Sequence, residues 1–483
     1  MVTSDVAAVR NEVGRLPAKT PEVLPPSEWA AQQWAQVNLG DRRLNRRALE
    51  MGAKMAAKPE ASLPSQMESR KALRGAYLVL NNPRVSLETL LAPHIRQTLA
   101  AAGWGTVALM VEDTTELDYT SYWGKSGLGE IGNGKGRGLL LHTTLAVESE
   151  QRQVLGVAHA QVVLRQPTPA GHSSGRTGSP EGKLWEVSAE NVGRPPEGVI
   201  WVHVGDAGSD IFEYMTACLD RGKHFLLRAH FNRRLAWDED DTKAGADKAQ
   251  QLLDYARSLP AYPDSGYTVQ VPARGEQPAR EACVVLAWAE TTIRPPKNGS
   301  PESRRRGPIR VWVLRVWEES PPTGAEPLEW VLLSSLPIIC LPEATRATAW
   351  YSCRWLCEDY HQCLKTGCGV EHTQLDDGAD IKRLLGFSVP IAARLLQLRQ
   401  SARQTPDLPA TAVVEPLMVE VLARREKRDA QNLTVLQFWR EVARLGGHQG
   451  RRGDGPPGWQ TIWKGWRLLS DLTQGARLFA NGP

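Results

Sequence analysis

The stretch from Tyr351 to Lys365 reads Tyr-Ser-Cys-Arg-Trp-Leu-Cys-Glu-Asp-Tyr-His-Gln-Cys-Leu-Lys. It contains neither Pro nor Gly, so it is expected to form a helix, which the glycines that follow it then end. At about 100° per residue, Tyr351, Arg354, Glu358 and Lys365 fall within roughly 60° of one another around the helix axis. One carboxylate, two cations and a phenol therefore share one stripe. An ordinary solvated helix face can carry the same residues, so the rest of the chain must decide between the two interpretations.

The composition is typical of a globular chain of several domains. The 483 residues are 41% hydrophobic and 23% charged, which predicts two to four domains with ample material for a core. We find no run of about 18 apolar residues and no apolar segment at the polar N-terminus, which predicts a cytoplasmic protein without membrane contact. Four of the seven Cys lie between Cys353 and Cys368, which does not fit a secreted disulfide framework.

The N-terminal part is basic. Residues 1–105 carry 14 Lys and Arg against 9 Asp and Glu, a balance of +5, whereas the whole chain has a net charge of +4. Asp41 is expected to cap a helix in which Leu44, Ala48, Met51 and Met55 share one side. The opposite side carries Arg42, Arg43, Arg46 and Arg47 without an acid among them. This arc is either a solvated face or a surface that binds phosphates, and the self-repulsion of four Arg favours the second.

Two acids follow apolar strands in the middle of the chain. Thr106–Val111 is a β-prone run that ends in Glu112-Asp113, and Val199–Val204 is another that ends in Gly205-Asp206. Along the chain, strands are followed by a helix, by a strand that leads to Asp206 and, later, by a helix that carries Glu358. This order is expected of a mixed α/β sheet flanked by helices. Such a sheet gathers acids that are distant in sequence at one edge.

Five regions follow from the changes in pattern along the chain. They are a helical domain at 1–105, the first part of an α/β core at 106–230, a β-rich insertion at 231–330, the last part of the core at 331–400 and a helical C-terminal region at 401–483.

Three converging carboxylates would repel one another unless cations separated them. Carboxylate oxygens are preferred ligands of hard cations, so Asp113, Asp206 and Glu358 are candidate ligands of one or two Mg²⁺ or Mn²⁺ ions. Two such ions can stabilise the attacking and leaving oxygens of a phosphoryl transfer. Singly, each Asp is as well explained as a loop cap, so the hypothesis depends on the three acids together.

The same residues resemble a known family. Tyr351, Arg354, Glu358 and Lys365 have the spacing of the Tyr-x2-Arg-x3-Glu-x6-Lys (YREK) signature of cut-and-paste DDE transposases from bacterial insertion sequences. Glu-Asp-Thr-Thr at 112–115 and Gly205-Asp206 resemble the contexts of the family's two catalytic Asp. Leu39-Gly40-Asp41-Arg42-Arg43 resembles its DNA-binding domain, and the resemblance covers nearly the whole chain.

The resemblance implies an RNase H-like core and a C-terminal region used for dimerisation. It implies a catalytic triad of Asp113, Asp206 and Glu358 that binds divalent metal, with Tyr351, Arg354 and Lys365 as phosphate-binding residues. Trp330 corresponds to a Trp that stacks on a flipped base, although a half-buried strand aromatic is the plain alternative. The expected partners are double-stranded DNA, both terminal inverted repeats and target, and a second copy of the chain in a synaptic complex at the nucleoid. Cleavage through hairpin ends is expected.

One departure from the family keeps an alternative open. Ala207-Gly208 follows the second Asp, where family members often carry Arg-Glu. A catalytically weakened or non-catalytic DNA-binding regulator derived from a transposase is therefore the second hypothesis, and a metal nuclease without end specificity is a third.

Three further patterns are weighed. Gly127-Leu-Gly129-Glu-Ile-Gly132 matches a dinucleotide fingerprint as a string, but it lacks the strand–turn–helix context, and its neighbours Lys135 and Arg137 are better placed to touch DNA. The cysteines of the central helix are expected to be core residues rather than zinc ligands. Three Arg that follow the strand at 225–229 are candidate DNA contacts or solvent-exposed residues: Arg228, Arg233 and Arg234.

Overall fold

The computed structural model describes residues 24, 26–122, 124–165, 180–236, 251–271, 279–297, 299–404, 406–451 and 457–480. Within these ranges, no helix has the length and apolar character needed to cross a membrane.

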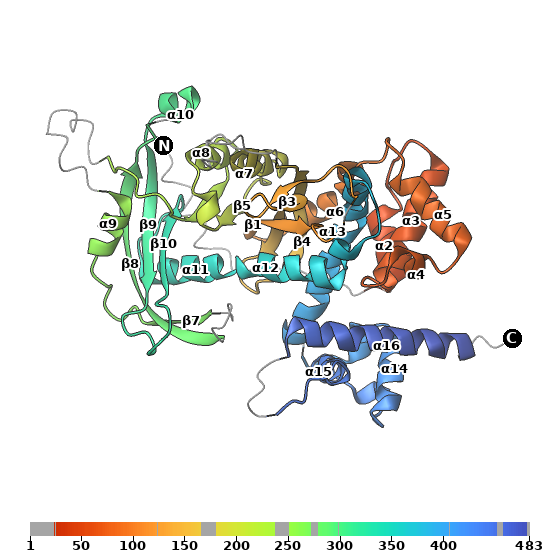
Figure 1. Ribbon diagram of the computed structural model, residues 1–483. Coiled ribbons are helices and arrows are strands. Elements are labelled where there is room, and N and C mark those ends of the chain that lie inside the picture. The colour runs from red at the N-terminus through yellow and green to blue at the C-terminus, as the bar shows by residue number, and fades with distance from the viewer. Residues whose placement is uncertain are drawn as a thin grey trace.

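A single mixed sheet organises the molecule (Figure 1). Its strands follow the order β2-β3-β1-β5-β6-β10-β9-β8-β7, and β4 pairs with β3 outside this path. β1 is antiparallel to β3 but parallel to β5, and β5 is parallel to β6. The bounds of the strands are β1 Val107–Asp118, β2 Gly129–Ile131, β3 Gly136–Glu148, β4 Val154–Val163, β5 Ile200–Gly205, β6 His224–Arg228, β7 Tyr267–Val271, β8 Arg280–Ile293, β9 Ile309–Trp317 and β10 Glu329–Ser334.

Helices cover both faces of the sheet, so successive residues of its central strands are buried. The helices α7 (Pro180–Asn191) and α8 (Phe212–Asp220) lie together on one face (Figure 1). The other face is covered by α11 (Leu341–Ser352), α12 (Trp355–Gln362) and α13 (Gly378–Gln404). This arrangement confirms the expected α/β class and is consistent with an RNase H-like core.

Between residues 26 and 105, the structure describes five helices before the sheet: α2 (Pro26–Trp34), α3 (Arg42–Ala57), α4 (Leu63–Met67), α5 (Arg70–Leu80) and α6 (Leu87–Ala101). Asp41 caps α3 as expected, because its side chain accepts hydrogen bonds from the backbone N–H groups of Arg43 and Leu44. Trp34 fills the core of this lobe with 1% of its surface exposed. A Cβ on Gly52 would lie 2.3 Å from the Trp34 ring, so α3 can pack this closely against Trp34 of α2 only with a glycine at position 52.

The β-rich insertion extends the central sheet. β8 pairs with β9, β9 with β10, and β10 with β6, all antiparallel. The strands expected as a separate β-rich element therefore continue the sheet that carries Asp206. Two short helices accompany them, α9 (Leu252–Ser258) and α10 (Pro301–Arg306).

The central stretch is not one regular helix. α11 ends at Ser352 and α12 begins at Trp355, and Cys353 and Arg354 form a turn between them although both keep right-handed helical dihedral angles. A π-helical turn then spans Cys363–Gly367. The prediction of a continuous helix is therefore wrong at Cys353 and Arg354, although the chain keeps its direction. Cys353, Cys357 and Cys363 are buried in the core as expected.

Three helices follow α13 in the chain: α14 (Pro416–Arg425), α15 (Val435–Leu445) and α16 (Trp459–Ala480). They form a separate lobe beside the sheet (Figure 1). Trp439 of α15 stacks on Trp466 of α16 with ring centroids 5.3 Å apart, so the tryptophans of the tail pack helices together.

Candidate active site

Asp113 and Asp206 lie side by side because of strand register. In the parallel pair of β1 and β5, Glu112 is opposite Gly205, so the next residue on each strand is an Asp. Asp206 follows β5 directly and caps a short 3₁₀ turn, Ala207–Ser209, by accepting a hydrogen bond of 2.7 Å from the Gly208 N–H. Asp113 was expected at the end of a strand, but it lies inside β1, which continues to Asp118. Asp113 is half-buried, and its Oδ1 accepts a hydrogen bond of 2.7 Å from the Thr114 N–H.

The electrostatics of the pair reflect this proximity. Burial raises the pKa of Asp113, the negative charge of Asp206 adds to the rise, and that of Glu358 adds a smaller part, so that the net pKa is about 6. The Thr114 N–H and the Arg354 guanidinium act in the opposite direction. Asp206 and Glu358 therefore both act on Asp113, and a cation near Asp113 would stabilise its charged form.

Glu358 is oriented toward a cation of its own helix. It lies on α12 with its side chain 53% exposed, and its Oε1 is 2.7 Å from Nη1 of Arg354. Among the described residues, no three His, Cys, Asp or Glu side chains are arranged closely enough to hold a metal ion. The structure thus brings Asp113 and Asp206 together and leaves Glu358 nearby, in an ion pair.

Tyr351 is buried and interacts with Arg354 of this ion pair. Burial raises the pKa of Tyr351 to about 12, and Arg354 and Arg228 act against the rise. Arg354 therefore lies close to Tyr351, Glu358 and Asp113, each of which interacts with its guanidinium. Lys365 is not paired with this group, because its Nζ is 3.5 Å from Oε1 of Glu371 and forms an ion pair there. The expected stripe is thus divided into a close group of three and a separate lysine.

Trp330 does not offer a free ring face in this structure. Its side chain is only 4% exposed and makes edge contacts with Tyr351 and Trp355, at centroid distances of 4.9 and 5.8 Å. The ring is more buried than the expected half-buried strand aromatic, because Tyr351 of α11 and Trp355 of α12 pack against it, and stacking on a flipped base stays a prediction.

The arginines of α3 face away from the buried side, as expected. Leu44, Ala48, Met51 and Met55 are all buried. Arg42, Arg43 and Arg46 are exposed, and Arg47 is half-buried. The arc is not free of acids, however, because Glu50 lies 3.7 Å from Arg46. That part of the charge argument is wrong, since the pair at positions i and i+4 neutralises one of the four cations.

The other predicted DNA contacts have different environments. Lys135 is exposed at the turn between β2 and β3, and Arg137 donates a hydrogen bond of 3.2 Å to the carbonyl of Lys125. Arg228 donates a hydrogen bond to the carbonyl of Glu329. Arg233 is bound by Asp210, whereas Arg234 is exposed.

A buried polar cluster around Glu112, the residue before Asp113, was not predicted from the sequence. Glu112 is fully buried and accepts hydrogen bonds from His142 (3.2 Å), from His203 and from the Tyr214 hydroxyl (2.9 Å). Burial acts to raise the pKa of Glu112, but His203 and His142 hold it well below its usual value. The sequence signal was the presence of His142 and His203 within otherwise apolar strands.

Two family models match this chain. The model described as Transposase DNA-binding matches residues 26–85, and the model described as Transposase Tn5 dimerisation domain matches residues 390–481. The first match covers the helices around α3, and the second covers part of α13 and the C-terminal lobe. Together they support a Tn5-like transposase, a DNA-processing enzyme that binds DNA and forms a homodimer.

Proposed function

We propose that the protein is a cut-and-paste DNA transposase that cleaves transposon ends with a catalytic triad of Asp113, Asp206 and Glu358. The observation that carries the proposal is the register of β1 and β5, which makes Asp113 and Asp206 adjacent and electrostatically coupled. Their position between a DNA-binding match and a dimerisation match supports DNA as the substrate. Hairpin formation at the ends and a synaptic dimer belong to the same proposal.

The carboxylates fit a hard divalent cation as donors. Two adjacent oxygen donors, one with a raised pKa, are suited to Mg²⁺ or Mn²⁺, and Glu358 would complete the ligand set after release from Arg354. When bound, such ions supply charge stabilisation for the attacking and leaving oxygens of phosphoryl transfer.

Arg354 is placed to exchange partners when DNA binds. Its guanidinium holds Glu358 in this structure, and a guanidinium binds phosphate in the same two-pronged way as carboxylate. A DNA phosphate near α12 would therefore compete for Arg354 and free Glu358 for the metal. The Tyr351 side chain interacts with Arg354 and orients its guanidinium. Lys365 provides a second positive charge for a phosphate after release from Glu371.

The test is cleavage of duplex DNA that carries the short inverted repeats flanking the gene. Cleavage is expected to require Mg²⁺ or Mn²⁺ and to fall at least about 1,000-fold in Asp113→Ala, Asp206→Ala and Glu358→Ala, because each removes a metal ligand. DNA binding should persist in all three variants, since the DNA-binding match at 26–85 is remote from them in sequence.

Glu319→Ala serves as the control, because it removes an exposed acid that is outside the triad and forms no ion pair with the proposed phosphate-binding residues. Full cleavage by the Asp113→Ala or Glu358→Ala protein would refute the triad. End binding without any cleavage by the unmodified chain would instead favour a non-catalytic regulator.

A further inference from the structure

A buried arginine without an acid partner lies where α13 meets the N-terminal helices. Arg394 has only 8% of its surface exposed. Its guanidinium lies over the ring of Trp29 of α2, with Cζ 4.9 Å from the ring centroid, and its Nη2 donates a hydrogen bond of 2.7 Å to the carbonyl of Leu24. Neither contact supplies a negative charge.

One edge of this guanidinium has no hydrogen-bond partner. Nη1 of Arg394 is buried, and no group accepts a hydrogen bond from it within the part of the chain that the structure describes. The ion pairs formed among the described residues do not include Arg394 either. The face of the guanidinium is therefore occupied by the Trp29 ring, whereas the N–H groups of Nη1 can still bind an acceptor.

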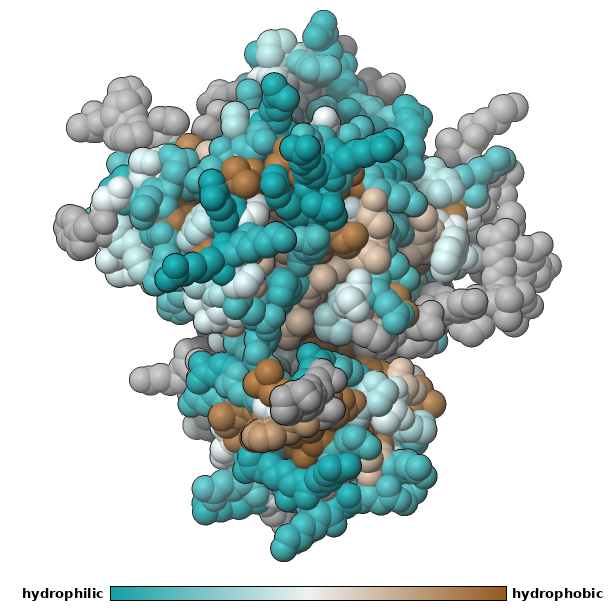
Figure 2. Space-filling view, turned by 90° about the vertical axis from the view of Figure 1, so that its right-hand side faces the viewer, coloured by the Kyte–Doolittle hydropathy of each residue, from teal (hydrophilic) through white to brown (hydrophobic). Residues whose placement is uncertain are grey.

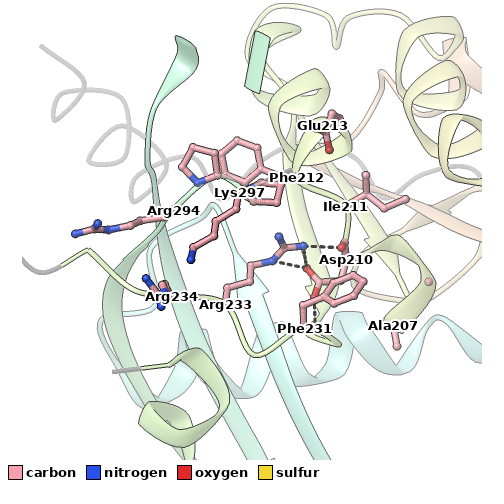
Figure 3. Close-up of a pocket in the computed structure, with 13 residues that line it drawn as sticks. Ala207, Asp210, Ile211, Phe212, Glu213, Phe231, Arg233, Arg234, Arg294 and Lys297 are labelled. Atoms are coloured by element: carbon pink, nitrogen blue, oxygen red, sulfur yellow. Dashed lines mark hydrogen bonds and ion pairs between the residues drawn. The ribbon is translucent and has the colours of Figure 1, made fainter. Parts of the chain in front are cut away.

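Arg233 shows the usual way in which an arginine is buried. Its side chain is also 8% exposed, but its Nη2 is 2.7 Å from Oδ1 of Asp210. Figure 3 shows this pair in the wall of a cavity that Ala207 also lines. Arginine is seldom buried without such a partner, because an uncompensated charge in the interior is strongly destabilising. Arg394 therefore requires an anion that the described side chains do not supply.

The guanidinium of Arg394 keeps its charge at neutral pH. Burial lowers the pKa of Arg394 to about 10, which is still well above neutral pH. Loss of the proton therefore does not remove the unpaired charge, so a negatively charged ligand is the remaining way to compensate it.

Arg394 lines a cavity of about 60 Å³ between three parts of the molecule, namely the N-terminal helices, α13 and the C-terminal lobe. Three basic residues of the lining, Lys58, Arg394 and Arg477, stand against one acid, Glu415, a balance of +2. The positive charge favours an anion in this cavity.

The other two cations of the lining already have acids. Lys58 Nζ is 2.8 Å from Oε1 of Glu68, and Arg477 forms an ion pair with Glu415. Arg394 is thus the cation of this lining that the described acids leave uncompensated. The Gln474 side chain of α16 also lines the cavity, and its amide nitrogen can donate a further hydrogen bond to a ligand.

The class of the ligand follows from the guanidinium and from the size of the cavity. A guanidinium binds oxyanions through parallel N–H groups. One water needs roughly 10–15 Å³ of such space, so 60 Å³ holds about four to six water-sized groups, as many as the five heavy atoms of phosphate or sulfate. The sugars on either side of a DNA phosphate would not fit in the same space.

We propose that this cavity binds one free tetrahedral oxyanion, inorganic phosphate or sulfate, through Arg394. Residues of the match to the DNA-binding model and of the match to the dimerisation model both line the cavity, so the anion stabilises the packing of these two parts on α13. The inference uses none of the three proposed catalytic acids and is therefore independent of the proposed function.

The first experiment is equilibrium dialysis of the full chain against radiolabelled inorganic phosphate, at constant ionic strength and without metal or DNA. The unmodified chain should bind one phosphate per chain in a saturable manner. Arg394→Met should bind it at least 10-fold more weakly, because the charge is lost. Arg394→Lys, which keeps the charge but not the parallel N–H groups, should lie between the two.

Lys382→Met is the matched control, since it removes the same charge from α13 at a position outside the cavity lining. Its affinity for phosphate should equal that of the unmodified chain. An equal loss in Lys382→Met and Arg394→Met would show a general charge effect and would overturn the inference. Absence of saturable binding by the unmodified chain would overturn it as well, and that outcome does not depend on the folding of any variant.

The second experiment measures the melting temperature at increasing phosphate concentration, against sodium chloride of equal ionic strength. Saturating phosphate should raise the melting temperature of the unmodified chain by about 1–3 °C, because the anion binds only the folded state. The rise should be absent in Arg394→Met. The same rise in both proteins would be the general effect of a salt excluded from protein surfaces and would contradict the proposal.

A third experiment asks whether DNA supplies the phosphate instead. The dialysis is repeated with a saturating amount of duplex DNA, again without metal. The amount of radiolabelled phosphate bound per chain should not change. Displacement of the phosphate in proportion to the DNA added would assign the site to the DNA backbone and would reject a free anion.

Discussion

The buried carboxylate of Glu112, the residue before Asp113, is stabilised by hydrogen bonds. Its carboxylate accepts three hydrogen bonds, from two imidazoles and a phenol, and none of the three side chains is exposed. Burial lowers the pKa of His203, so we assign a neutral His203 imidazole whose Nδ1–H donates to a charged carboxylate. Such a network stabilises a fold only while every member remains paired.

Glu112→Gln should therefore lower the free energy of unfolding by about 2–4 kcal/mol, because the amide nitrogen cannot accept hydrogen bonds from these donors. Urea titration followed by circular dichroism measures the change. Glu150→Gln, at an exposed site near the end of β3, should change it by less than about 0.5 kcal/mol. A Glu112→Gln protein as stable as the control would show that the cluster contributes nothing net.

His94 joins three elements: α6, on which it lies, α2 and β4. Its Nε2 accepts a hydrogen bond of 3.0 Å from the Val157 N–H, and Nδ1 is 2.8 Å from Oε1 of Gln33. The Nε2 contact requires an unprotonated nitrogen there, so Nδ1 carries the proton and donates it. Burial lowers the pKa of His94 to about 4. Protonation would break the contact between the N-terminal lobe and the sheet.

The sign of the pH dependence follows from that shift. The unfolded chain takes up a proton at His94 near pH 6.5, whereas the folded chain does so only near pH 4. The contribution is therefore fully present above pH 6.5 and is lost as the pH falls to 4, at a cost of about 3 kcal/mol.

His94→Gln should flatten the pH dependence of the free energy of unfolding in this window, as measured by urea titration at several pH values. Other buried histidines, such as His361, titrate in both proteins, so the difference between them isolates His94. Identical curves for the two proteins would contradict the assignment.

The elements show which parts of the structure local sequence can predict. The cap at Asp41 and the buried side of α3 follow from spacing within a few residues, and both are confirmed. The sequence places Asp206 correctly after an apolar strand, but Asp113 lies inside β1, which continues to Asp118, so the adjacency of the two acids depends on the register of β1 and β5.

The features that the sequence could not predict depend on contacts with residues far away along the chain. Trp330 was expected to be at most half-buried, because a strand pattern does not tell which helices will cover it, and its full burial depends on α11 and α12. The union of the insertion with the core depends on pairing between β10 and β6, which are about 100 residues apart. The break at Cys353 and Arg354 contains no Gly or Pro and left no local signal.

Charge and hydropathy are distributed unevenly over the whole molecule. Figure 2 shows mostly hydrophilic side chains over the upper part of the molecule and a hydrophobic patch on the lower, C-terminal lobe. The exposed apolar residues of α16 are Leu468, Leu472, Leu478 and Phe479. They lie within the match to the dimerisation domain, so we expect them to contact a second copy of the chain.

Leu468→Asn/Leu472→Asn should therefore weaken self-association at least 10-fold, because two leucines that the dimer would bury each contribute about 1.5–3 kcal/mol. Light scattering coupled to size-exclusion chromatography measures the dissociation. Leu408→Asn is the control, since Leu408 is equally exposed, at 44%, but lies outside α16. Binding of one DNA end should survive in the double variant, whereas cleavage that requires two paired ends should be lost with the dimer. A double variant that remains dimeric at the same concentration would move the dimer interface away from this face of α16.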